Sequence, residues 1–282
     1  MSWRLAVRHT TGYRYARPVP ASYNEARMTP LSTDRQTTID ARLVVQPSVR
    51  VSRYWDYWGT LVHAFDTHVP HDELVVTASA VVDTGDDIPD DWRPISWDAL
   101  RDDEVRDRLY EYLQPTHSTR SDARLLGVAA DLAGEASDPG AAVMVARDWV
   151  NSQLAYQRGA TSVSTSALEA WRDGRGVCQD FAHLALALLR AMGIPGRYVS
   201  GYFHPDGDAA VGDKVVGESH AWAEAWIGDW QPFDPTNTLP VGSRHVLVAR
   251  GRDYSDVSPL KGVYSGAPSS TPNVSVELTR LG

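Results

Sequence analysis

Cysteine is nearly absent from this chain of 282 residues: Cys178 is the only one, so no disulfide can form within the chain. Stretches of 18 consecutive apolar residues are missing as well, which excludes a membrane-spanning helix of ordinary length. The first residues, Met1 to Arg4, have neither the basic nor the apolar region of a secretory signal. We therefore expect a cytoplasmic protein, in a reducing compartment that keeps a single thiol free.

Runs of Lys and Arg are also missing, and the formal net charge is -9 with a pI near 5.4. A phosphate backbone or an anionic membrane would need clustered positive charge to bind it. We expect neither nucleic acid nor a membrane as a partner. The pattern gives no indication of the oligomeric state.

Metal-binding motifs such as HExxH and CxxC do not occur. His63, His68 and His71 lie close together, but in a strand-rich stretch without a cysteine, where a hairpin or surface role is the better interpretation. Asp206 and Asp208 belong to an acidic turn that lacks the remaining ligands and the closing Glu of a calcium loop. We expect no metal and no cofactor.

Residues 1–82 show the two-residue period of β-strands and no helical period. The first strand should cover residues 3–15 with one wet face, and Pro18 and Pro20 should end it. Residues 24–27 should lie in a loop. Hydrophobic residues make up 43% of the chain, enough for a proper core. The pattern predicts an antiparallel β-sandwich-like domain over residues 1–82, with further strands at 38–45, 53–57, 61–65 and 74–82.

An acidic linker at residues 83–96 should separate this domain from a core at residues 97–282. Helical periodicity predicts helices around residues 105–112, 125–132 and 143–154, the second of them capped by Ser121. A fourth helix should start near Cys178. Strands should follow, which makes the whole chain α+β, with helices first and an antiparallel sheet after. The strands are expected at residues 196–202, 215–227, 230–233, 244–251 and 273–280.

Cys178 stands where that fourth helix should begin. Apolar residues from Phe181 to Met192 recur at helical spacing, and Gly193 marks the end of the helix. Unpaired N–H groups at a helix start favour negative charge, so a thiol there ionises more easily. A thiolate is the nucleophile that amide chemistry needs. The alternative is a buried cysteine that acts as a small hydrophobe.

His220 belongs to a short run in which small and bulky residues alternate, as in a strand. The small face, formed by Ser219 and three alanines, could lie against a helix. The bulky face would then point His220 and its neighbouring tryptophans into a cleft. The alternative is a histidine on an ordinary half-buried strand.

Asp234 follows the next predicted strand, after a hairpin turn at Gly228 and Asp229. If the two strands pair, Asp234 returns beside the early part of the His220 strand. A carboxylate there can accept the far N–H of the imidazole and fix its tautomer. The alternative is turn chemistry alone, for which Asp-Pro-Thr-Asn is well suited.

The three residue types of a nucleophile, a base and an orienting group are present in Cys178, His220 and Asp234. The segments around them resemble the bacterial transglutaminase-like proteins, which share the papain-like cysteine protease fold. The resemblance extends to both ends of the chain, as in the two-domain bacterial branch with a β-rich N-terminal domain. It implies that Cys178 is the nucleophile, His220 the base and Asp234 the orienter. The segments are GRGVCQDFAHLALALLRAMGIPGRYVSGY, ESHAWAEAW, WQPFDPTN, YNEARMTP and GRDYSDVSPLKGVYSG.

The expected chemistry is thiol-dependent acyl transfer on a peptide or isopeptide amide, with water or a primary amine as the acceptor. The Cys178 backbone N–H should bind the oxyanion, helped by Gln153 or Tyr156. Trp171 and Trp222 are the expected cleft residues, although both could simply pack in the core. These residues suit a peptidase, an amidase or a transglutaminase-type transferase.

Two other functions fit the same residues. A catalytically silent module could use the same cleft to hold peptides. An arylamine-type acyltransferase has the same order of Cys, His and Asp, but it would need a coenzyme A pocket, and no phosphate-binding loop is visible.

Overall fold

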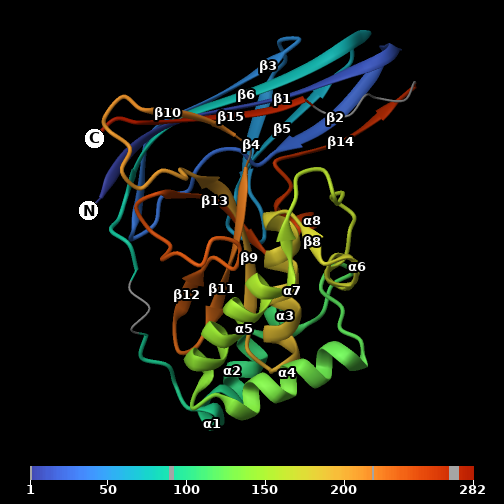
Figure 1. Cartoon of the computed structure of the whole chain (residues 1–282). Helices are drawn as coiled ribbons and strands as arrows, with labels where there is room; N and C mark the ends of the chain where they lie inside the picture. Colours follow the sequence, from blue (N-terminus) through green and yellow to red (C-terminus); the bar gives the residue numbers. More distant parts are fainter. Residues whose placement is uncertain (1, 89–91, 218, 267–272) are drawn as a thin grey trace.

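The computed structural model describes residues 2–88, 92–217, 219–266 and 273–282. Two β-sheets lie at one end of the molecule, and helices with a third sheet form the other end (Figure 1). The predicted α+β layout, antiparallel strands followed by helices and a further antiparallel sheet, is confirmed. Within the described residues, no helix combines the length and apolar character that crossing a membrane requires.

The largest sheet has five strands in the order β10-β15-β1-β6-β3. Alternate residues of its first strand, among them Trp3, Leu5 and Val7, are buried, because successive side chains of a strand point to opposite faces. Two of the five strands come from beyond residue 200, so the sheet joins distant parts of the chain. The strands are β1 (Trp3–Val19), β3 (Gln36–Gln46), β6 (His71–Thr84), β10 (Lys214–Gly217) and β15 (Asn273–Arg280).

A four-stranded sheet in the order β14-β2-β5-β4 shares an apolar core with the first sheet. Phe65 of this sheet packs in one cluster with Tyr15, Val19, Leu74 and Val76 of the other. The two sheets therefore make a sandwich-like unit, which β10, β14 and β15 from the later part of the chain complete. The strands are β2 (Ala21–Ala26), β4 (Val51–Trp55), β5 (Leu61–Thr67) and β14 (Leu260–Ser265).

Two local predictions in this region are wrong. Residues 24–26 are not in a loop but in β2, where Asn24 pairs with both Gly262 and Phe65. Pro18 does not end the first strand, which runs on to Val19. The register with β6 shifts between Arg14 and Val19, so the missing N–H of Pro18 interrupts no regular ladder.

Helices form most of the other end of the molecule (Figure 1). The predicted helix near residues 105–112 is present as two short helices. The cap of the next predicted helix is Asp122 rather than Ser121, since the Asp122 side chain accepts the Leu125 N–H at 3.0 Å. The helices are α1 (Trp97–Leu100), α2 (Asp103–Arg108), α3 (Tyr110–Leu113), α4 (Ala123–Glu135), α5 (Pro139–Gln153), α6 (Ala167–Asp173), α7 (Cys178–Ala191) and α8 (Tyr254–Val257).

The third sheet has the order β12-β11-β9-β13 and packs against α7. Residues 179–190 of α7 are all buried, so this helix is central, as its apolar sequence predicted. Ala221, Ala223 and Ala225 of β11 belong to the same core cluster as the α7 side chains, which confirms the small face of that strand. The strands are β9 (Gly196–Phe203), β11 (His220–Trp226), β12 (Trp230–Phe233) and β13 (His245–Gly251).

Trp222, on the opposite face of β11, is covered by residues distant in sequence. Trp222 packs in a cluster with Leu31, Val199, Val241 and Leu247 and is 1% exposed. The single strand predicted over residues 215–227 is wrong, because β10 and β11 belong to different sheets. The short parallel pair of β7 (Ala155–Tyr156) and β8 (Arg175–Gly176) leads directly into α7.

Gly201 on β9 tests the tight packing of this sheet. A Cβ at this position would stand against the carbonyl oxygen of Val246 and 2.7 Å from the Trp222 ring. We expect Gly201→Ala to lower the free energy of unfolding by about 3 kcal/mol through overpacking. Urea titration followed by circular dichroism would measure it.

Gly127 provides the matched control. It lies exposed on α4, and a Cβ there would meet nothing within 4 Å. Gly127→Ala should raise the free energy of unfolding by about 0.5–1 kcal/mol, because alanine favours the helix. Equal effects of the two substitutions would contradict the packing account.

Candidate active site

The first turn of α7 fixes the position of Cys178. The Asp180 carboxylate reaches back to accept the Val177 N–H at 2.7 Å and the Thr161 hydroxyl at 2.6 Å. Gly176 makes room for this carboxylate, since a Cβ at Gly176 would stand 2.7 Å from Asp180. As the first residue of the helix, Cys178 has a backbone N–H without an intrahelical acceptor. That N–H is free to serve an oxyanion.

The Cys178 thiol is free and half-buried, and it lies beside the first residues of β11. Its Sγ is 3.9 Å from the carbonyl oxygen of Ser219, and its contact with the imidazole of His220 helps to raise the pKa of that ring. The structure thus brings together the helix start and the strand that the sequence singled out separately.

The other side of the His220 ring faces Asp234. His220 Nε2 lies 2.8 Å from Asp234 Oδ2. Burial alone would lower the pKa of His220, but the Asp234 charge, its hydrogen bond and the contact with Cys178 outweigh burial and raise this pKa to about 10. At neutral pH the ring is therefore an imidazolium held between a sulfur atom and a carboxylate.

Asp234 is fully buried, and the turn that follows it satisfies its charge. Its Oδ1 accepts the backbone N–H groups of Thr236 at 2.8 Å and of Asn237 at 3.1 Å, and its Oδ2 accepts the Asn237 side-chain amide at 2.8 Å. Burial opposes ionisation, yet the neighbouring imidazoles and hydrogen bonds hold the pKa of Asp234 well below its usual range. The predicted hairpin is present, and the pairing of Phe233 with Ala223 brings Asp234 to His220.

His245 is a second imidazole on Asp234 that the sequence analysis missed. Its Nε2 lies 3.5 Å from Asp234 Oδ2, and its Nδ1 accepts the Gly242 N–H at 3.3 Å, which leaves the proton on Nε2. Its ring packs against Phe203 and Trp222, with ring centroids 4.6 Å and 5.2 Å away. No short motif marks His245, because its place beside Asp234 depends on the pairing of β13 with β9.

The same atoms offer one arrangement that could hold a metal. His220 Nε2, Asp234 Oδ2 and His245 Nε2 lie within 4.8 Å of one another, the one such group among the described residues. In the structure these atoms hydrogen-bond one another. His71 instead contacts Ser22, with Nε2 3.2 Å from its hydroxyl.

The acidic turn at Asp206 and Asp208 forms a hydrogen bond within itself. Asp206 Oδ1 accepts the Asp208 N–H at 2.9 Å, as expected for a hairpin loop.

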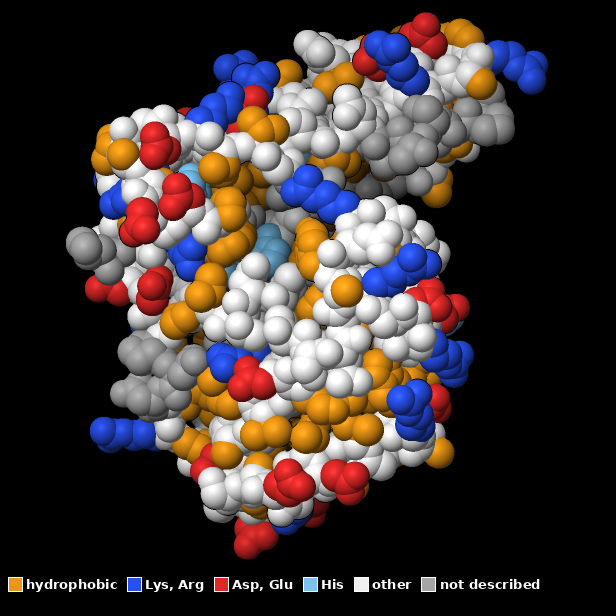
Figure 2. All heavy atoms as spheres, in the orientation of Figure 1, with side chains coloured by type: hydrophobic (Ala, Val, Ile, Leu, Met, Phe, Trp, Pro, Cys, Tyr) orange, Lys and Arg blue, Asp and Glu red, His pale blue; other side chains and the backbone are white. Residues whose placement is uncertain are grey.

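A cavity with an empty volume of about 850 Å³ lies against His220. Figure 2 shows a hollow in the middle of the molecule with a histidine at its floor and hydrophobic side chains on its walls. Cys178 meets the cavity wall at Ser219 and His220, which both line the cavity. The other lining residues are Tyr156, Arg158, Phe203, Pro205, Val215, Val216, Gly217, Thr236, Asn237 and Leu278.

Three of the residues predicted for the cleft or as a second oxyanion donor do not line this cavity. Gln153 Oε1 accepts the Trp171 Nε1–H at 3.3 Å. Trp171 also packs between Trp149 and Arg124, so both side chains stabilise the packing of the helices. Trp222 shares a face of β11 with His220, but it is buried in a cluster with Leu31 and Val241. Tyr156 does line the cavity and remains the candidate for a second oxyanion donor.

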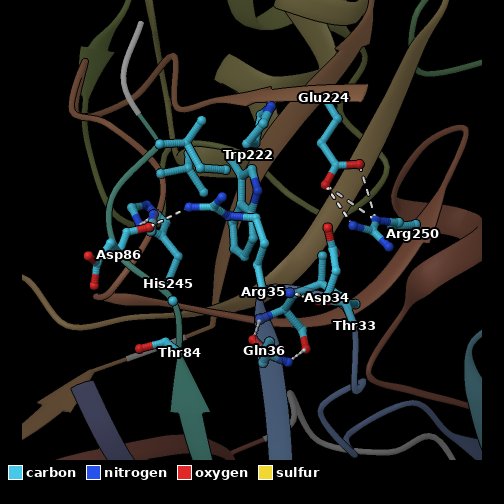
Figure 3. Close-up of a pocket in the computed structure, with 16 residues that line it drawn as sticks. Thr33, Asp34, Arg35, Gln36, Thr84, Asp86, Trp222, Glu224, His245 and Arg250 are labelled. Atoms are coloured by element: carbon cyan, nitrogen blue, oxygen red, sulfur yellow. Dashed lines mark hydrogen bonds and ion pairs between the residues drawn. The ribbon is translucent and has the colours of Figure 1, made fainter. Parts of the chain in front are cut away.

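A second cavity, with an empty volume of about 490 Å³, lies behind the site (Figure 3). His245 and Trp222 form part of its wall, and Arg35 crosses it to donate to the Asp86 carbonyl oxygen at 2.8 Å. Glu224 pairs with Arg250 at its rim, at 3.1 Å. His245 thus separates this cavity from Asp234.

Comparison with known proteins finds two family models that match this chain, and one of them covers the site. Residues 127–235, which include Cys178, His220 and Asp234, match the transglutaminase-like superfamily. Residues 5–83 match the bacterial transglutaminase-like N-terminal region.

Relatives cover nearly the whole chain. An uncharacterized protein of Mycobacterium leprae is 50% identical over 279 residues, covering 99% of each chain. An uncharacterized protein of Mycobacterium tuberculosis is 32% identical, covering 98% of this chain and 92% of its own. A crystal structure from Cytophaga hutchinsonii, described provisionally as a cysteine protease, has a TM-score of 0.81 at 25% identity and covers 100% of this chain and 92% of its own.

The raised pKa of His220 gives a pH prediction. A pKa of about 10, above the ordinary 6.5, means that the stabilisation from the protonated ring is complete below pH 6.5 and is lost as the pH rises through about 10. NMR of the His220 ring should therefore show an imidazolium throughout the neutral range. Asp234→Asn should move the titration back toward ordinary values; a wild-type ring that titrates near 6.5 would contradict the geometry.

His245 gives a second prediction. His245→Leu removes a donor from Asp234, and we expect the rate of Cys178 alkylation by iodoacetamide at neutral pH to fall about tenfold, the effect of one hydrogen bond to a charged group. His245→Gln should preserve most of the rate, since its amide can place an N–H near the Nε2 position. Equal losses in both variants, with unchanged circular dichroism, would count against a positioning role.

Proposed function

The chain belongs to the transglutaminase-like superfamily, and on this premise we propose that it is an enzyme that attacks peptide or isopeptide amide bonds through the thiol of Cys178. The observation that carries the proposal is the position of His220, which hydrogen-bonds Asp234 and contacts Cys178 at the wall of one cavity. Nucleophile, base and orienter are the groups that thiol acyl transfer requires.

The first half of the proposed reaction makes an acyl-enzyme. The Cys178 thiolate attacks the carbonyl carbon of the amide, a C–S bond forms, and the carbonyl oxygen becomes an oxyanion. The Cys178 backbone N–H, with the Tyr156 hydroxyl as the second donor, binds that oxyanion. The His220 imidazolium gives its proton to the amine nitrogen, the C–N bond breaks, and the amine leaves a thioester on Cys178.

The second half releases the acyl group. Neutral His220 takes a proton from water or from a primary amine, which attacks the thioester carbon, and the C–S bond breaks. Water yields a carboxylic acid, as in a peptidase or amidase, and an amine yields a new amide, as in a transglutaminase. His220 returns to the imidazolium form by this proton, so the cycle closes.

The electrostatics of the site support this sequence of steps. The raised pKa of His220 keeps the proton on the ring, ready for the leaving amine. The lowered pKa of Asp234 keeps the negative charge that stabilises the ring. The partners that we propose are a peptide or protein acyl donor and, in the transfer reaction, a primary amine. The proposal also places the enzyme in the cytoplasm, where the lone thiol stays reduced.

Mass spectrometry of a mixed peptide pool incubated with the protein, with and without a primary amine, tests the proposal. Hydrolysis should shorten peptides or convert amides to acids, and transfer should produce amine adducts. Cys178→Ala should lower either activity by at least about a thousandfold, because it removes the nucleophile.

His220→Ala provides the second arm, with a loss of similar size, since nucleophile and base act as a unit. Peptides that bind the wild-type protein but remain unmodified would instead show a silent binding module. Acyl-enzyme formation from acetyl-coenzyme A but from no peptide would point to an arylamine-type acyltransferase.

A further inference from the structure

The cavity beside His220 has an uneven distribution of charge. Four of its lining residues, Phe203, Pro205, Val215 and Leu278, form apolar walls. The described lining residues include one permanent charge, that of Arg158, and neither Asp nor Glu. This local positive charge contrasts with the net charge of -9 for the whole chain.

Arg158 is anchored close to the thiol by the backbone. The pair formed by β7 and β8 sets Tyr156 opposite Gly176, and the Gln157 N–H donates to the Gly176 carbonyl oxygen at 2.9 Å. Gly176 is two residues before Cys178. The ladder therefore carries the backbone of Arg158 to the rim of the cavity near the nucleophile.

The guanidinium of Arg158 has no carboxylate partner within the described part of the chain. Other arginines near the site do: Arg197 and Arg250 both pair with the buried Glu224. A cation at the rim of an apolar hollow, with no carboxylate partner among the residues that the structure describes, is suited to bind an anionic group of the ligand. Its planar set of donors matches a carboxylate in particular.

Resting on the proposed function, we infer that Arg158 selects acyl donors that carry a carboxylate close to the amide attacked by Cys178. The substrate class is a peptide with Asp, Glu or a free chain end beside that amide, and with an apolar side chain for the walls formed by Phe203, Val215 and Leu278. Val215 and Leu278 pair across β10 and β15, so the five-stranded sheet supplies one wall of the substrate site.

A synthetic peptide library that carries Glu, Gln or Lys at one position at a time tests the inference. At one position near the modified amide, the wild-type protein should process the Glu peptide with a kcat/KM about fivefold above that of the Gln peptide, as expected for one partly exposed ion pair. Arg158→Gln should abolish the preference, Arg158→Lys should keep part of it, and Arg158→Glu should shift it to Lys.

Two controls separate this effect from general electrostatics. Arg106→Gln removes the same charge from exposed α2, outside the cavity, and should leave the preference intact. Raising the salt concentration to about 0.5 M should weaken the preference in the wild type by screening. Glu218 lies between the lining residues Gly217 and Ser219 in the sequence, but outside the described residues. The peptide series is therefore repeated in Glu218→Gln, where the preference for the Glu peptide should persist.

The outcomes distinguish the inference from the function on which it rests. Turnover without a charge preference, or a preference unchanged in Arg158→Gln, overturns the inference and leaves the function standing. Absence of turnover overturns the function. The same peptides, fluorescently labelled, are then tested for binding to Cys178→Ala by anisotropy. If Cys178→Ala binds the Glu peptide more tightly than the Gln peptide, and Arg158→Gln removes this difference, the role of Arg158 is retained. If the two peptides bind equally, the role of Arg158 is overturned as well.

Discussion

The hydrogen bond between His220 and Asp234 is the interaction on which the rest of the site depends. A fully buried carboxylate is unfavourable unless its charge is compensated on every side. The turn after β12 supplies two backbone N–H groups and one amide, and β13 supplies the ring of His245. Because these donors hold the negative charge in place, His220 can stay protonated although it is buried. The chemistry proposed for Cys178 follows from that fixed charge.

The N-terminal sheets take part in this arrangement through β13. The Gln36 side chain donates to the carbonyl oxygens of Leu31 and Leu247 and accepts the Leu247 N–H at 2.8 Å. The Thr84 hydroxyl donates to the Ser243 carbonyl oxygen at 2.6 Å. These bonds hold β3 and β6 to the segment that carries His245. The β-rich part therefore supports Asp234 from behind, while β10 and β15 form a wall of the cavity in front of it.

Local patterns in the sequence predicted the parts of the site that depend on neighbouring residues. Helical spacing after Cys178 placed the thiol at a helix start, and the turn at Gly228 predicted the hairpin that returns Asp234 to His220. Long-range packing decided the rest. Trp222 lies on the same face of β11 as His220. Leu31 and Val241, which are distant in sequence, cover Trp222. His245 could not be predicted from spacing, because β9 stands between β11 and β13 and brings the two histidines to one carboxylate.

The pairing of β1 with β15 joins the first strand of the chain to the last. On the ribosome, β1 leaves the exit tunnel long before β15 is translated, so the five-stranded sheet cannot be completed during most of synthesis. The edge of β1 that β15 will occupy stays open during that interval. An open strand edge can pair transiently with another chain, so this order of assembly favours binding of a chaperone until β15 is made.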